Sequence, residues 1–120
     1  MVERYLKTNI CPLPWNSLEI DVNGGASPCC LYKGSIPNVK VYNTDLKSIQ
    51  KSQYMEDLRT QFRNGEKPVS CESCWQEESA GKTSKRMNSL YKMKNSLRNW
   101  TPNSKPTLKF IDFKLGNVCN

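Results

Sequence analysis

Hydrophobic and polar residues alternate early in the chain in a way that predicts a β-hairpin. Apolar residues occupy every second position from Leu18 to Val22, with acidic residues between them. This period of two is typical of a half-buried strand. The sequence Asn23-Gly24-Gly25 supplies the residues that a tight turn requires, and residues 27–32 can return as the second strand. We therefore predict an N-terminal hairpin.

Helical patterns follow a loop, residues 33–43, that is rich in Gly, Pro and Asn. Thr44 or Asp45 can cap a short helical turn, and Ser52 can cap the next helix. Asn64-Gly65 can end that helix, because glycine readily adopts the left-handed conformation found there. The apolar stripe of this helix consists of Tyr54, Met55, Leu58 and Phe62.

Two further helices are predicted in the second half. One begins at Cys71-Glu72-Ser73-Cys74, after Pro68, and ends near Ala80-Gly81. The other lies within residues 82–105, where Lys and Arg surround a stripe made of Met87, Leu90, Tyr91, Met93 and Leu97. The simplest interpretation is an amphipathic helix with a solvated basic face, and contact with phosphates is the alternative.

The two ends of the chain have other patterns. The first ten residues show no period, and the two prolines of Cys11-Pro12-Leu13-Pro14-Trp15 predict an extended turn rather than a helix. Residues 108–115 are strongly apolar and predict a strand. One hairpin cannot bury both faces of this strand, so we expect it to be the first strand of a sheet that is absent, in a chain truncated at its C-terminus.

Composition limits the chemistry of the chain. With 120 residues, of which 37% are hydrophobic, there is room for one small core, which a metal often completes. The absence of histidine excludes His-containing zinc fingers and Ser-His or Cys-His nucleophile pairs. The first ten residues lack the apolar region of a secretory signal and no stretch is long enough to cross a membrane, so we expect a cytoplasmic, reducing location.

Six cysteines are the main candidates for chemistry: Cys11, Cys29, Cys30, Cys71, Cys74 and Cys119. In a reducing compartment, a C-x2-C pair indicates metal binding or redox chemistry. At the start of a helix, backbone N–H groups are expected to lower the pKa of the thiols. Because neighbouring strand residues point to opposite faces, only one of Cys29 and Cys30 can easily share a site with Cys11. We expect a small α+β fold stapled by a metal.

The order of these motifs resembles the auxiliary-cluster segment of SPASM/twitch-type radical SAM proteins. The resemblance rests on four motifs: Cys11-x2-Pro-Trp, Gly24-Gly-x2-Pro-Cys-Cys, the helix end Arg63-Asn-Gly, and Cys71-x2-Cys-Trp-x2-Glu. It implies an auxiliary [4Fe–4S] cluster held by Cys11, Cys71, Cys74 and one of Cys29 and Cys30. The step Pro28-Cys29 favours Cys29. A fully ligated cluster would act as an electron relay, a substrate-positioning element or a structural staple.

The end of the chain, from Phe110 to Asn120, is similar to the first barrel strand of a radical SAM domain. This resemblance implies an auxiliary segment over residues 1–100, and a linker with the first strand of an α/β barrel over 101–120. Cys119 would be the first ligand of a second [4Fe–4S] cluster, which binds S-adenosylmethionine in the family. The partner would be the remaining barrel, without which the chain should not be catalytic. The substrate stays open between peptides, sugars and small metabolites.

A second class of protein uses the same residues. Four cysteines also suit a structural zinc site, and 18 Lys and Arg against 11 Asp and Glu give a net charge of +7 that would suit nucleic acid. In this alternative residues 82–105 contact phosphates. The zinc alternative leaves the strand before Cys119 unexplained.

Overall fold

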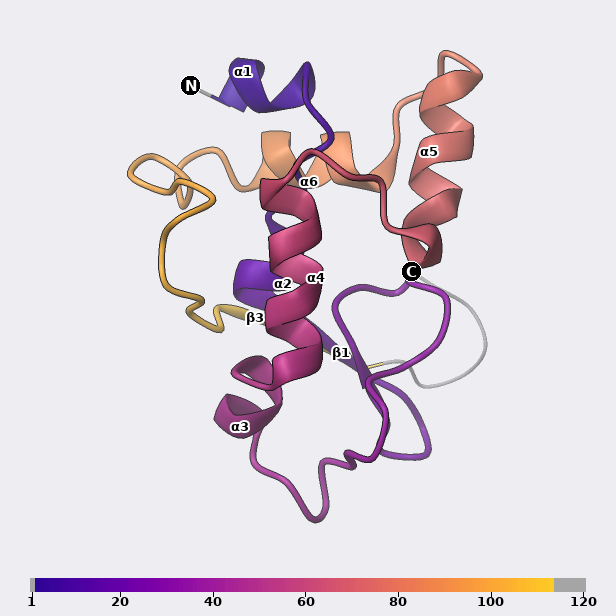
Figure 1. Cartoon of the computed structure of the whole chain (residues 1–120), viewed down its shortest axis with the longest axis vertical. Coiled ribbons are helices and arrows are strands. Elements are labelled where there is room, and N and C mark those ends of the chain that lie inside the picture. Colours follow the sequence, from indigo (N-terminus) through magenta and orange to yellow (C-terminus); the bar gives the residue numbers. More distant parts are fainter. Residues whose placement is uncertain (1, 114–120) are drawn as a thin grey trace.

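A computed structural model describes residues 2–113 and shows a small α+β fold of short helices around a three-stranded sheet (Figure 1). The strands are β1 (Ser17–Ile20), β2 (Ala26–Ser27) and β3 (Phe110–Phe113). The α-helices are α1 (Val2–Leu6), α2 (Leu13–Asn16), α3 (Leu46–Gln50), α4 (Gln53–Arg63), α5 (Glu72–Ser79) and α6 (Lys85–Lys92), and a 3-10 helix, η1 (Val69–Cys71), leads into α5. Among these residues no helix is long and apolar enough to cross a membrane.

The central strand of the sheet is β1, which pairs with β2 on one side and β3 on the other. The pairing with β2 is antiparallel and aligns Glu19 with Ser27, which confirms the N-terminal hairpin. At its turn, Gly24 has φ +83° and the Asp21 carboxylate accepts hydrogen bonds from two backbone N–H groups. The second strand is shorter than predicted, because Pro28 has no N–H to continue the pairing.

The prediction that the C-terminal strand has no neighbour in the chain is wrong. β3 pairs in parallel with β1, aligning Ser17 with Phe110 and Ile20 with Phe113. Both faces of β3 nevertheless remain exposed, and Phe113 keeps 68% of its surface accessible. The predicted strand end at Leu115 and the predicted cluster ligand Cys119 lie outside the described residues.

The helices after the loop at 33–43 begin and end where the sequence predicts. Asp45 caps α3 and Ser52 caps α4, each accepting a hydrogen bond from a backbone N–H inside its helix. Gly65 follows α4 with φ +77°. In Figure 1, α4 lies in front of β1 and α2, and its buried side chains Met55, Leu58 and Phe62 join the hydrophobic core with Trp15, Leu18, Ile49 and Leu90.

The N-terminal region contains two helices, and the prediction of an extended turn over residues 11–15 is wrong. α1 packs against α6, and α2 follows Cys11 directly after Pro12. The prolines are compatible with α2 because both lie at its start, Pro12 as the N-cap and Pro14 within the first turn. The N–H groups at these positions have no partner within a helix, so their loss costs nothing.

The basic segment is less regular than predicted. α6 spans eight residues, after which residues 93–99 form turns. Tyr91, expected in the apolar stripe, is 52% exposed, whereas Arg86, expected on a solvated basic face, is only 2% exposed. Arg86 lies four residues before the fully buried Leu90 and therefore shares its face of the helix.

Candidate metal centre

Four cysteines from separate parts of the sequence converge on one cavity. Cys11 precedes α2, Cys29 follows β2, Cys71 ends η1, and Cys74 lies in the first turn of α5. All four carry free thiols. Cys30 is not among the described residues that line the cavity. The fold thus brings together four of the five predicted site residues, and the fifth, Cys119, is outside the described range.

A turn, and not a strand, places Cys29 at the cavity. Both residues follow the end of β2, so the prediction that strand alternation separates them rests on a wrong premise. The backbone turns at this point, with the Tyr32 N–H donating to the Cys29 carbonyl at 3.3 Å. This turn leaves Cys29 at the cavity.

The remaining walls of the cavity are mostly apolar. They consist of Leu13, Leu31, Tyr32, Phe62, Trp75, Lys85 and Arg86. The cavity volume is about 20 Å³, close to the space of one water molecule, so the cysteine side chains fill most of the room between these elements. The donor set is entirely sulfur, which suits iron–sulfur clusters and zinc and does not suit magnesium or calcium.

Among residues 2–113, no three Cys, Asp or Glu side chains are arranged to hold a metal ion as they stand. A single zinc ion draws its thiolates to about 3.8 Å from one another, since each Zn–S bond is about 2.3 Å long. The ligands of a polynuclear cluster bind separate irons and are spaced further apart. Either metal would therefore require the four cysteines of this cavity to move.

Burial raises the pKa of three of these thiols. Desolvation is the main cause at Cys11, Cys29 and Cys71, and neighbouring cysteines add to the rise at all three. The pKa of Cys71 rises to about 12, so the prediction that the start of the helix lowers it is wrong for this residue. Backbone N–H groups oppose the rise, from Leu13 at Cys11 and from Leu31 at Cys29. A cation is needed to hold these sulfurs as thiolates at neutral pH.

Contacts between loops hold the cysteines in place. The Lys33 N–H donates to the Ser70 carbonyl at 2.8 Å, and the Lys33 ammonium pairs with Glu72. These contacts join the turn after Cys29 to the segment that carries Cys71. The Trp75 indole N–H donates to the Pro68 carbonyl at 2.9 Å and so fixes α5 on the same segment.

Arg86 connects the cysteine-bearing segments to the N-terminus, a role that the sequence analysis missed. Its guanidinium donates to both carboxylate oxygens of Glu78, at 2.8 and 2.9 Å. It also donates to three backbone carbonyls, those of Tyr5 at 3.0 Å, Leu6 at 3.2 Å and Ile10 at 2.9 Å. The signal in the sequence was that Arg86 precedes the apolar Leu90 by four residues and so lies on the same face of the helix. Arg86 therefore fixes the backbone immediately before Cys11.

The comparison with known families agrees with this site. Residues 11–75, more than half of the 120-residue chain, match SPASM, an iron–sulfur cluster-binding domain. The chain belongs to this family. The matched segment contains all four cysteines of the cavity. No curated protein and no solved structure gave a significant match to the chain.

Proposed function

We propose that Cys11, Cys29, Cys71 and Cys74 hold a [4Fe–4S] cluster, and that the domain is the auxiliary-cluster domain of a radical SAM enzyme. The observation that carries this proposal is the convergence of four free thiols, from three separate segments of the chain, on one cavity of a SPASM domain. The motif order of the sequence supports the radical SAM context.

The residues at the cavity fit such a cluster. An all-thiolate cluster is anionic, and the cavity wall includes Lys85 and Arg86, although Glu78 already pairs with Arg86. Apolar side chains such as Leu31 and Phe62 limit access by water. Backbone N–H groups directed at the Cys11 and Cys29 sulfurs are typical of sites that tune cluster potentials. The cavity of about 20 Å³ is smaller than a cluster, so the side chains around it must move to admit one.

Four protein ligands saturate a [4Fe–4S] cluster, which when bound accepts and passes on single electrons. No iron would remain open for S-adenosylmethionine. The function of this domain is therefore to relay electrons, to position a substrate or to staple the fold, and catalysis would belong to a radical SAM barrel as its partner.

The zinc and nucleic-acid alternative loses part of its support. Arg86, one of the basic residues assigned to phosphates, is buried in an ion pair with Glu78. The family to which the chain belongs binds iron–sulfur clusters. Metal analysis after purification decides between the two metals.

The test is anaerobic reconstitution of single Cys→Ser variants at each of the four positions, with Cys30→Ser as the matched control. We expect each of the four variants to lose iron and visible absorbance, and Cys30→Ser to keep both. Retention of full iron content by Cys29→Ser together with its loss in Cys30→Ser would move the fourth ligand to Cys30.

The saturated ligation has its own test. Adding S-adenosylmethionine to the reduced, reconstituted domain should leave its electron paramagnetic resonance spectrum unchanged. A shifted spectrum would show an open iron and contradict the auxiliary role.

A further inference from the structure

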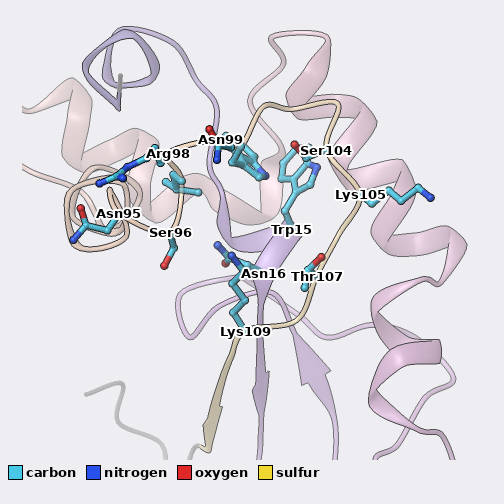
Figure 2. Close-up of a pocket in the computed structure, with 12 residues that line it drawn as sticks. Trp15, Asn16, Asn95, Ser96, Arg98, Asn99, Ser104, Lys105, Thr107 and Lys109 are labelled. Carbon is cyan, nitrogen blue, oxygen red and sulfur yellow. The ribbon is translucent and has the colours of Figure 1, made fainter.

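A second cavity lies away from the cysteines. It has a volume of about 400 Å³, within the range of small-molecule sites, and none of its described lining residues borders the cysteine cavity. Figure 2 shows Trp15 and Asn16 in its centre and Lys109 below Asn16. Asn95, Ser96 and Arg98 lie on one side, and Ser104, Lys105 and Thr107 on the other.

The walls of this cavity are held by backbone and ring contacts. The Thr107 N–H donates to the Trp15 carbonyl and the Lys109 N–H to the Asn16 carbonyl, both at 2.9 Å, so the second wall is fixed to α2. On the other wall, Trp100 packs edge-on against Trp15 with ring centroids 5.2 Å apart. The cavity is thus formed by the fold and does not depend on a single mobile loop.

Unpaired polar atoms gather at this cavity. Four buried side-chain nitrogen or oxygen atoms in residues 2–113 have no hydrogen-bond partner, and three belong to residues that line it. They are the indole nitrogens of Trp15 and Trp100 and the side-chain oxygen of Asn16. Trp15 is 1% and Asn16 is 5% exposed. Each such atom costs about 1–3 kcal/mol when left unpaired, so their concentration at one cavity points to a ligand.

The charge of the cavity is one-sided. Of its described lining residues none is acidic, whereas Arg98, Lys105 and Lys109 are basic. In Figure 2, Lys109 rises toward Asn16, while Arg98 and Lys105 extend outward from the two rims. None of these three cations forms a salt bridge within residues 2–113. All three are exposed, so a negatively charged group would meet Lys109 beside Asn16 and a positive field at the opening.

We propose that this cavity binds a small molecule that carries an oxyanion, a carboxylate or a phosphate, beside a hydroxyl or amide N–H. Lys109 and the two indole N–H groups donate to the oxyanion, and the Asn16 oxygen accepts from the neighbouring donor. Because the indole nitrogens and the Asn16 oxygen are covered, entry of the ligand requires exposed side chains at the opening, such as Asn99, to move. The site does not depend on the proposed cluster function.

Nuclear magnetic resonance of the indole N–H signals tests this proposal on the reconstituted 120-residue chain. The probes are N-acetylglycine, glycerol 3-phosphate and the neutral analogue N-acetylglycinamide. Of the three tryptophans, Trp15 and Trp100 should show saturable shifts with an oxyanion probe, and the third, Trp75, already donates to Pro68 and should not shift. A stronger response to N-acetylglycine assigns a carboxylate ligand, and a stronger response to glycerol 3-phosphate assigns a phosphate.

Two variants test the named contacts. Lys109→Gln should weaken binding by roughly tenfold or more, because it removes a charge-assisted hydrogen bond. Lys51→Gln, which removes the same charge from an exposed position outside the cavity, should leave binding unchanged. Trp100→Phe keeps the aromatic contact with Trp15 but removes the N–H, and should also weaken binding; a purely structural role of Trp100 predicts no change.

Three results would overturn the proposal. They are the absence of saturable shifts with either oxyanion, equal affinity for the neutral analogue, and equal affinity of Lys109→Gln and the wild type. Binding of a single-stranded oligonucleotide without binding of either small oxyanion would also overturn it, in favour of a nucleic-acid surface.

Discussion

Replacing Arg86 by Met removes the guanidinium that joins α5, α6 and the segment before Cys11, while keeping a long apolar side chain of similar reach. Arg86 is 2% exposed and makes five hydrogen bonds, two to Glu78 and three to backbone carbonyls. The variant leaves the Glu78 carboxylate without its cation and three carbonyls without this donor.

The expected loss follows from these contacts. Breaking a buried ion pair by removing one partner costs about 3–5 kcal/mol, because the other charge stays buried. Glu78 is partly exposed and keeps a hydrogen bond from Ser84, which limits its share of the cost, whereas the carbonyls add to it. We expect a loss of about 3–5 kcal/mol in the free energy of unfolding, a large part of the roughly 5–15 kcal/mol typical of a domain.

Urea unfolding of the anaerobically reconstituted protein measures this loss. The matched control is Lys92→Met, which removes an exposed cation from the same helix and should change stability by less than about 0.5 kcal/mol. Arg86→Met should also retain less iron, because Ile10, one of the carbonyl partners, directly precedes Cys11. A loss below about 1 kcal/mol with full iron content would refute the organising role of Arg86.

Two further predictions concern the pH dependence of stability and the removal of the metal. Burial alone would raise the pKa of Glu78, but hydrogen bonds from Arg86 and Ser84 hold it below the ordinary value of 4.5. The ionised Glu78 carboxylate therefore contributes its full stability above pH 4.5, and this contribution is lost as the pH falls toward the lowered pKa of Glu78. The difference in unfolding free energy between the wild type and Glu78→Gln should accordingly shrink below about pH 4.5. Removing the metal with a chelator should cost hydrogen-exchange protection at residues 29–33 and 69–75, while α4, most of which packs in the hydrophobic core, stays protected. Equal loss of protection in α4 would show that the core itself depends on the metal.

The sequence predicts the parts of the fold that depend on neighbouring residues. Asp45 and Ser52 cap their helices and Gly65 ends α4, because each acts on backbone groups within a few positions. The hairpin turn at Gly24 is equally local. The four cysteines of the cavity could also be predicted from the sequence, because their spacing and the order of their motifs carry information that a single C-x2-C pair lacks.

Features that depend on distant partners could not be read in the same way. Arg86 looks like a surface residue until Glu78 and three carbonyls of residues 5–10 surround it. β3 looks isolated until β1, about ninety positions earlier, pairs with it. Likewise, Cys29 reaches the cavity through a turn after Pro28, whereas the sequence pattern predicted that strand alternation separates Cys29 from Cys30.

Quantitative iron, sulfide and zinc analysis of the anaerobically reconstituted protein tests whether the four thiols hold an iron–sulfur cluster. We predict about four irons and four sulfides per chain, with broad charge-transfer absorption in the visible range. One zinc per chain, no sulfide and no visible absorption would contradict it.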